Sequence, residues 1–116
     1  MITLAQLVDD VVVNKFAIDS ATTTIGRHPD STIQINDAAI SGRHAVITLE
    51  KSKYIEGSVE LYLEDLNSKN GSFINDKPIN GRQQLNNNDV LRFGWNEFKL
   101  LHADPQSLES TALILS

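Results

Sequence analysis

Cysteine is absent from this chain of 116 residues, and long apolar runs are absent as well. Without cysteine, neither a disulfide framework nor a cysteine-ligated metal site is available, which suits a reducing compartment. No run approaches the length of a membrane-spanning helix. The N-terminus lacks the basic segment followed by an apolar core that marks a secretory signal. Together these absences predict a cytoplasmic protein.

Positive charge is also scarce, because 10 basic residues face 15 acidic ones and the formal net charge is −5. This balance argues against sequence-independent binding to nucleic acid, which depends on lysine and arginine neutralising phosphates. It leaves room for a local cationic site, since seven of the ten basic residues lie between Arg27 and Arg82. The three histidines show no metal-ligand spacing, and neither a P-loop nor a dinucleotide-binding fingerprint is present. We therefore expect no metal and no cofactor.

What the chain does contain is a series of short apolar runs separated by turn residues. The clearest runs are residues 22–25, 33–35, 45–49, 60–64, 90–93 and 98–101. Many short strands with frequent turn signals indicate an all-β sandwich or barrel. We expect antiparallel pairing, because the connections are too short for crossover helices. The length and the apolar fraction of 41% predict one domain with a modest core.

The N-terminal segment is ambiguous in its periodicity. The apolar residues from Leu4 to Val11 recur at helical spacing. However, Val11–Val13 is a β-branched run of the kind enriched in strands. We predict two strands here, joined by a turn at Asp9–Asp10.

The C-terminal segment differs in composition from the rest. We assign residues 1–102 to the domain and residues 103–116 to a tail, because Pro105 interrupts strand pairing and mostly polar residues follow. Residues 112–115 are apolar again, which is unusual for a solvated tail. We expect them to cover a sheet edge or to contact a partner. The alternative is that Thr111 is a phosphosite whose phosphate docks at Arg27 of its own chain or of a neighbour, which would give self-association through the tail.

Three polar clusters interrupt the apolar runs, namely Gly26–Arg27, Ser41–His44 and Asn70–Ser72. A glycine at a strand end lets the backbone turn sharply and approach a ligand. A guanidinium is a fork of donors that matches phosphate or carboxylate. Taken singly, each cluster is better explained as an ordinary turn with solvated side chains. Donors converging from separate loops nevertheless favour an anionic, phosphorylated ligand.

Two other interpretations of these clusters need stronger patterns than the chain provides. A hydrolase using Ser41 and His44 requires a nucleophile bonded to its base and a third group that orients the base. Neither a nucleophile elbow nor a partner for His44 is visible, so we interpret His44 as structural. The stretch from Asp65 approaches a calcium-loop pattern, but Lys69 and Asn70 occupy positions that require a ligand and a glycine.

In order and spacing, the three clusters resemble those of the forkhead-associated (FHA) domain family. The matching segments are Thr24–Arg27, Ile40–Ala45, Asp65–Asn75 and Leu85–Gly94, within a resemblance that spans roughly Ile2–His102. The resemblance implies an eleven-stranded antiparallel β-sandwich with its ligand loops at one end. It also implies that the chain is not an enzyme. The implied activity is binding of phosphothreonine-containing proteins or peptides that a Ser/Thr kinase pathway produces.

The resemblance assigns binding roles to individual residues. Arg27 and Ser41 correspond to phosphate-binding positions. Lys69 corresponds to an auxiliary phosphate or peptide contact, and Asn70 to the residue that holds the peptide main chain. The full expected phosphopeptide-binding set is Arg27, Ser41, Gly42, Arg43, Lys69 and Asn70.

Four further residues are expected to support the site, namely Gly26, His44, Gly71 and Asn75. By resemblance, His44 ties the loops together and Asn75 braces the loop after Asn70–Gly71. A second functional interpretation keeps the FHA-like scaffold but has it bind an unphosphorylated partner through a sheet face.

Several residues depart from the family pattern, and these departures affect how the site would recognise peptide residues next to the phosphothreonine. Gly42 stands where the family usually has a basic or polar side chain. Ala39 gives its loop no charge, so we expect no acidic preference three residues after the phosphothreonine if this loop reads that position. Ser72 in place of a threonine is a milder change. Trp95, the only tryptophan, is expected to pack in the core or at an edge.

Overall fold

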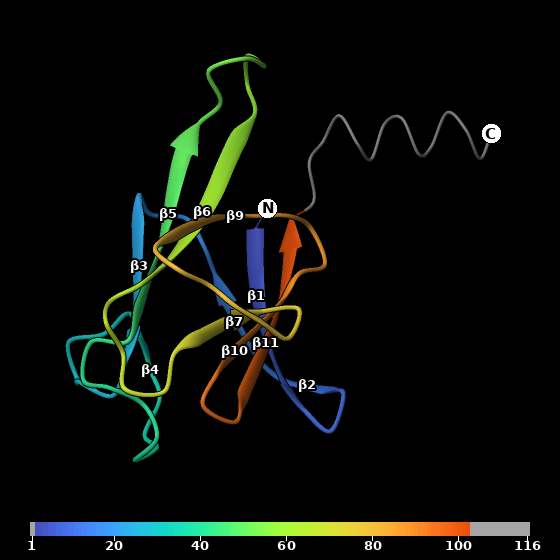
Figure 1. Cartoon of the computed structure of the whole chain (residues 1–116). Coiled ribbons are helices and arrows are strands. Elements are labelled where there is room, and N and C mark those ends of the chain that lie inside the picture. Colours follow the sequence, from blue (N-terminus) through green and yellow to red (C-terminus); the bar gives the residue numbers. More distant parts are fainter. Residues whose placement is uncertain (1, 103–116) are drawn as a thin grey trace.

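The computed structural model describes residues 2–102, which form eleven strands without a helix. The strands are β1 (Ile2–Val8), β2 (Val11–Ala17), β3 (Thr22–Gly26), β4 (Ile33–Gln34), β5 (Ala45–Lys51), β6 (Val59–Asp65), β7 (Ser72–Ile74), β8 (Lys77–Pro78), β9 (Arg82–Leu85), β10 (Val90–Phe93) and β11 (Asn96–His102) (Figure 1). The predicted all-β class and the number of strands are confirmed. The predicted tail, including Thr111, lies outside the described residues. Within that range no helix exists that is long and apolar enough to cross a membrane.

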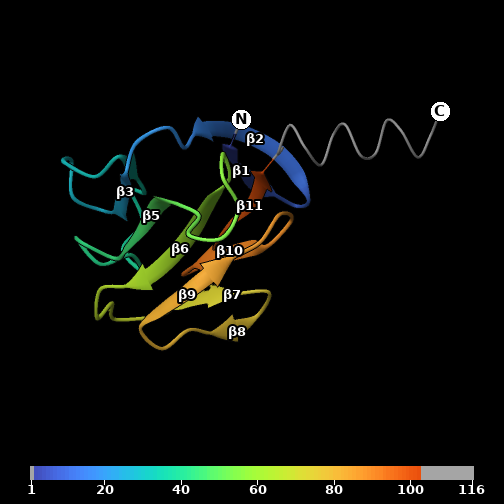
Figure 2. The same cartoon turned by 90° about the horizontal axis from the view of Figure 1, so that it is seen from above.

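The strands form two sheets that pack face to face, as the view from above shows (Figure 2). The six-stranded sheet has the order β2-β1-β11-β10-β7-β8, and the five-stranded sheet has the order β4-β3-β5-β6-β9. We call them sheet A and sheet B. Hairpins connect four of the neighbouring pairs, namely β1–β2, β5–β6, β7–β8 and β10–β11.

One strand pair departs from the predicted antiparallel arrangement, since β3 and β4 run parallel. Loop 27–32 explains this pairing. The chain turns where the Ser31 N–H donates to the His28 carbonyl at 3.0 Å. The Thr32 N–H then donates to the Thr24 hydroxyl oxygen at 2.8 Å, so the chain returns beside β3 and leaves in the same direction. A parallel contact of two residues therefore needs no crossover helix.

The N-terminal segment forms the predicted pair of strands, and the helical alternative is wrong. Asp9 and Asp10 lie in the turn with φ of 51° and 65°. Two consecutive left-handed residues are the signature of a type I′ hairpin turn. The β-branched run at Val11–Val13 lies in β2, at the edge of sheet A.

The core lies between the two sheets, where alternate side chains of the central strands, such as β6 and β10, point inward. Sheet A contributes Phe93, Phe98 and other residues, and sheet B contributes Ile47, Leu61 and Leu63, all at most 1% exposed. Each such side chain contributes about 1.5–3 kcal/mol by burial. The packed sandwich is thus a rigid frame for its loops.

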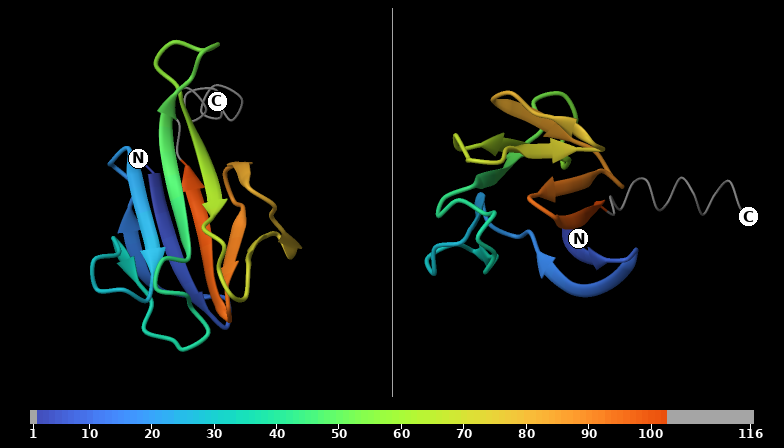
Figure 3. Two further views of the ribbon diagram at one scale, coloured as in Figure 1. Left: turned by 60° about the vertical axis from the view of Figure 1, so that its left-hand side comes forward. Right: turned by 60° about the horizontal axis from the view of Figure 1, so that its bottom comes forward.

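The connections 27–32, 35–44 and 66–71 gather at one end of this frame (Figure 3). The long β5–β6 loop lies at the opposite end (Figure 1). Each of the three polar clusters therefore falls at the same end of the sandwich, although up to 46 positions separate them in the sequence, from 26 to 72.

Candidate functional site

Backbone hydrogen bonds hold the end of β3 against the segment that leads into β5. The Arg27 N–H donates to the Ser41 carbonyl at 3.0 Å, and the His28 N–H donates to the Gly42 carbonyl at 3.1 Å. These bonds extend the pairing of the two strands into their loops. The structure therefore brings the backbones of Arg27 and Ser41 together.

Gly26 permits this close approach. A Cβ atom at position 26 would lie 2.2 Å from the Gly42 carbonyl oxygen and 3.0 Å from the Ser31 hydroxyl oxygen. The first distance is a severe overlap with backbone that cannot move freely. The φ of Gly26 is not positive. The glycine is therefore needed for space and not for an unusual backbone conformation.

His44 is fully buried and joins the loops through both ring nitrogens. Its Nδ1 accepts from the Ser41 N–H at 3.2 Å, and its Nε2 lies 2.8 Å from the Gly71 carbonyl oxygen. Because a carbonyl only accepts, these partners assign the hydrogen to Nε2. The ring also packs edge-on against Phe93, with 5.6 Å between centroids. His44 thus connects the Ser41 loop, the Gly71 loop and the core.

The hydroxyl of Ser41 is positioned by the third loop. Its Oγ accepts from the Lys69 N–H at 2.9 Å, which leaves the hydroxyl hydrogen for a ligand. The two nitrogens of His44 are already bound to backbone groups, so His44 is not the base that a Ser–His hydrolase would need. The geometry therefore argues against that alternative.

Asn70 links its loop to the segment before β5. Its Nδ2 donates to the Ala39 carbonyl at 2.7 Å. That bond uses one amide hydrogen. The amide oxygen and the second hydrogen remain able to bond a peptide main chain, which offers one donor and one acceptor per residue.

Asp65 organises the loop that carries Lys69 and Asn70, a role that the sequence did not reveal. Its carboxylate accepts from the Ser68 N–H at 3.0 Å, from the Ser68 hydroxyl and from the Ser72 hydroxyl at 2.6 Å. Burial raises the pKa of Asp65, but these hydrogen bonds outweigh it and hold the pKa below the usual range of an aspartate. The ionised carboxylate therefore clamps the loop at both ends.

Asn75 lies in the turn that follows β7. Its side chain donates to the Asp89 carboxylate at 2.9 Å and accepts from the Val90 N–H at 2.9 Å. These bonds tie the β7–β8 turn to the start of β10. The three residues of β7 separate Asn75 from Asn70–Gly71, and a role of Asn75 in bracing the loop after Asn70–Gly71 stays a prediction.

The cations at this end of the sandwich are not neutralised by nearby carboxylates. Side-chain ion pairs in the described part of the chain are His28–Asp30, Arg82–Glu50 and Arg92–Asp76. Arg27, Arg43 and Lys69 take part in none of them. All three side chains are exposed. An anion would therefore meet positive charge that is not already committed.

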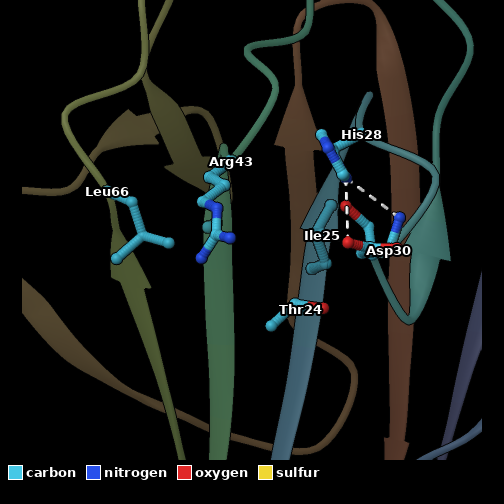
Figure 4. Close-up of a pocket in the computed structure, with 8 residues that line it drawn as sticks. Thr24, Ile25, His28, Asp30, Arg43 and Leu66 are labelled. Carbon is cyan, nitrogen blue, oxygen red and sulfur yellow. Dashed lines mark hydrogen bonds and ion pairs between the residues drawn. The ribbon is translucent and has the colours of Figure 1, made fainter.

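Gly42 and Arg43 differ in the groups that they offer a ligand. A Cβ at Gly42 would meet nothing within 4 Å, so the residue borders open space and contributes backbone only. Arg43 lies two residues before β5 and lines a small cavity on the outer face of sheet B with Thr24, His28 and Leu66 (Figure 4). Gly71 supplies the carbonyl that binds His44, with φ of 82°.

The sequence interpretation also missed a surface beside Asn70. A cavity of about 250 Å³ is lined by Ala39, Asn70, Phe73, Arg92, Gly94 and Trp95. Trp95 is 86% exposed there, so its expected place in the core or at an edge is wrong. The position of Trp95 directly after Gly94, between two short apolar runs, was the signal that could have revealed a tryptophan exposed in a turn. Among the described residues, no group of three or more acidic, histidine or cysteine side chains is arranged to hold a metal.

Comparison with known proteins gives consistent relatives. The family model of the FHA domain matches residues 23–94. The glycogen accumulation regulator GarA of Mycobacterium tuberculosis is 35% identical over 77 residues, which cover 66% of this chain and 43% of GarA. The oxoglutarate dehydrogenase inhibitor of Corynebacterium efficiens is 37% identical over 87 residues, which cover 75% of this chain and 54% of that protein. The matches thus span about half the length of these relatives or less.

Solved structures agree with this grouping. An FHA-domain structure from a structural and functional analysis of phosphothreonine-dependent FHA domain interactions superposes on this chain with a TM-score of 0.73. The sequences are 29% identical, and the match covers 89% of this chain and 97% of that chain. The similarity therefore includes nearly the whole sandwich and its loop end.

Proposed function

Because the chain belongs to the FHA domain family, we propose that it is a non-catalytic module that binds phosphothreonine peptides at the loop end of the sandwich. One observation carries the proposal. Ser41 is bonded through its carbonyl to Arg27 and through its hydroxyl oxygen to Lys69. A hydroxyl donor thus lies between two residues whose cationic side chains have no carboxylate partner within residues 2–102.

The chemistry of this cluster suits a phosphate monoester. Phosphothreonine carries a charge of about −1.5 to −2 and three acceptor oxygens. Arg27, Ser41 and Lys69 supply a guanidinium fork, a hydroxyl and an ammonium. Charge-assisted hydrogen bonds contribute about 1.5–3 kcal/mol each. Together with main-chain contacts they suit micromolar binding, near −8 kcal/mol. Such binding is reversible and would follow the activity of a kinase.

Asn70 supports recognition of a peptide rather than of free phosphate. Its amide is fixed by the Ala39 carbonyl next to the Ser41–Lys69 contact. We propose that its remaining amide groups bond the main chain beside the phosphothreonine. The cavity beside Asn70 would then take a flanking side chain. Its walls include Phe73 and Trp95, and the guanidinium of Arg92 is stacked on the Phe73 ring at 4.1 Å. We therefore propose an apolar preference at that flank, and no acidic preference, because Ala39 brings no charge to its loop.

The relatives support a regulatory setting. One is named as a glycogen accumulation regulator and another as an oxoglutarate dehydrogenase inhibitor. We propose that this chain likewise acts by holding partner proteins, in a cytoplasmic Ser/Thr kinase pathway. Self-association through the tail at Thr111 remains a prediction from the sequence.

Arg27→Ala tests the proposed function directly. Binding of a library of phosphothreonine peptides, measured by fluorescence anisotropy, is expected to fall at least about a hundredfold because a charge-assisted bidentate contact is lost. Arg82→Ala is the matched control. Arg82 is also an exposed arginine, but it pairs with Glu50 on sheet B, and its removal should leave binding unchanged. Equal binding of the dephosphorylated library to the wild-type protein would overturn the proposal.

The alternative is phosphate-independent binding through a sheet face, and a double variant separates the two. Arg27→Ala combined with Ser41→Ala removes two of the proposed phosphate contacts without touching the outer faces of the sheets. Under our proposal this variant no longer retains partners from a phosphorylated mixture. A partner that stays bound to it, and that lacks phosphothreonine by mass spectrometry, would favour the sheet-face alternative.

A further inference from the structure

A small hollow lies on the outer face of sheet B, next to the loops that join Arg27, Ser41 and Lys69. It is a cavity of about 110 Å³ lined by Thr24, Ile25, His28, Asp30, Ser31, Arg43, Ala45 and Leu66. Figure 4 shows it between the Arg43 and Leu66 side chains on one side and the His28 and Asp30 side chains on the other. We call it the Leu66 cavity.

The Leu66 cavity lies close to the proposed phosphate site, because two of its lining residues are sequence neighbours of Arg27 and Ser41. Arg43 follows Ser41 by two positions, and His28 follows Arg27. Leu66 is held there because its N–H donates to the His44 carbonyl at 2.9 Å. A peptide whose phosphate is bound at Ser41 would therefore have a flanking residue within reach of the cavity.

The polar groups on the rim are largely satisfied by each other. The Asp30 N–H donates to the His28 Nδ1 at 3.1 Å. The Thr24 hydroxyl oxygen accepts from the Thr32 N–H at 2.8 Å. In Figure 4 this hydroxyl points away from Arg43, and the methyl group of Thr24 points toward that side. These bonds leave the interior of the cavity without a strong demand for a polar ligand.

The remaining walls are apolar. Ile25 and Ala45 are buried, and Leu66 is 39% exposed although it is a large aliphatic side chain. The hydrocarbon stem of Arg43 lies along the same cavity, as arginine stems commonly do on apolar surface. The volume is somewhat smaller than the roughly 150 Å³ of an engineered apolar cavity that holds benzene. It therefore suits a branched aliphatic group of three or four carbons.

We propose that the Leu66 cavity binds the side chain of a valine, leucine or isoleucine that flanks the phosphothreonine in the partner peptide. The cavity lies on the outer face of sheet B, whereas the cavity at Trp95 lies beside Asn70 and the outward-facing Phe73 and Arg92 of sheet A. The phosphate would thus be bound between two subsites on opposite sides of the sandwich end. This inference rests on the proposed phosphothreonine binding and adds a sequence requirement to it.

The test begins with a library of phosphothreonine peptides that is randomised at about four positions on either side of the modified residue. Besides the apolar preference proposed for the cavity at Trp95, valine, leucine or isoleucine should be enriched at a second position, on the other side of the phosphothreonine. The selected peptide and its counterpart with alanine at that position then form a matched pair. With the wild-type protein, the alanine peptide should bind about tenfold more weakly, as expected for loss of an aliphatic group from an apolar pocket.

Leu66→Gln tests whether the Leu66 cavity causes the difference in affinity between the selected peptide and the alanine peptide. This variant should weaken binding of the selected peptide about tenfold and leave binding of the alanine peptide unchanged. Val12→Gln is the control, because Val12 is a similarly exposed aliphatic residue on β2 and should affect neither peptide. Thermal unfolding monitors the integrity of each variant.

Other outcomes would contradict the inference in distinguishable ways. If an acidic residue were enriched and its selection were lost in Arg43→Ala, the peptide side chain would form an ion pair with Arg43. The cavity would then not bind an aliphatic group. Equal weakening of both peptides by Leu66→Gln would show that Leu66 only supports the loop. Selection of phosphothreonine peptides without any aliphatic preference would contradict the proposed role of the Leu66 cavity. Phosphothreonine binding itself would still stand. Failure of every phosphothreonine peptide to bind the folded protein would refute the proposed function itself.

Discussion

At Gly26, the space for a single methyl group decides whether two functional loops can touch. Gly26→Ala should lower the free energy of unfolding by about 1–3 kcal/mol, because the new Cβ would overlap the Gly42 carbonyl and force the backbones apart. The same separation should weaken phosphopeptide binding. Urea unfolding and anisotropy measure the two effects.

Gly42→Ala is the control for that substitution. It also adds a methyl group to this pair of loops, but nothing lies within 4 Å of the new atom. Its free energy of unfolding should stay within about 0.5 kcal/mol of wild type. Equal stabilities of the Gly26 and Gly42 variants would show that the close contact is not a constraint on the fold.

At the scale of elements, the β1–β2 hairpin shows how a turn determines register. Asp10 adopts φ of 65°, a left-handed conformation that costs most L-residues about 1–2 kcal/mol. Asp10→Gly should raise the free energy of unfolding by about 0.5 kcal/mol, because the relief of that cost exceeds the added entropy of an unfolded glycine, about 0.5–1 kcal/mol.

Asp10→Val provides the opposite sign at the same position. A β-branched residue tolerates this φ poorly, so this variant should be less stable than wild type by at least about 1 kcal/mol. Chemical denaturation of the two variants gives the comparison. The turn assignment would be wrong if valine were tolerated as well as glycine.

For the molecule as a whole, Asp65 should make stability depend on acidity. Its pKa in the folded state lies below the unfolded value of about 3.9. Between the folded-state and unfolded-state pKa values, the unfolded chain binds more protons than the folded chain. The free energy of unfolding therefore rises with pH across that range. The contribution of Asp65 is present above about pH 4 and is lost as the pH falls through the folded-state pKa.

Asp65→Asn isolates this contribution. The variant should be less stable than wild type at pH 7, and the difference should shrink as the pH is lowered below about 4. Glu56→Gln, an exposed substitution in the β5–β6 loop, should retain the wild-type profile. Urea unfolding between about pH 3 and 7 provides the data, and a difference independent of pH would remove the carboxylate from this role.

The sequence by itself determined the class of fold and the kind of site. Period-two apolar runs and turn residues predict strands without knowledge of their partners, because both signals are local. The three polar clusters carry the resemblance to the FHA family, and the hairpin turn at Asp9–Asp10 follows from residue types alone.

Only the tertiary structure decided how those clusters meet and which neighbours support them. Pairing of β3 with β4 depends on hydrogen bonds between Thr24 and Thr32, eight positions apart. The protonated nitrogen of His44 is assigned by Gly71, and the Leu66 cavity depends on packing between separate loops. The Asp65 clamp is more local, because it joins residues up to seven positions apart around one loop. Local sequence patterns report propensity, whereas these features result from specific side-chain and loop contacts that form only when the chain has folded.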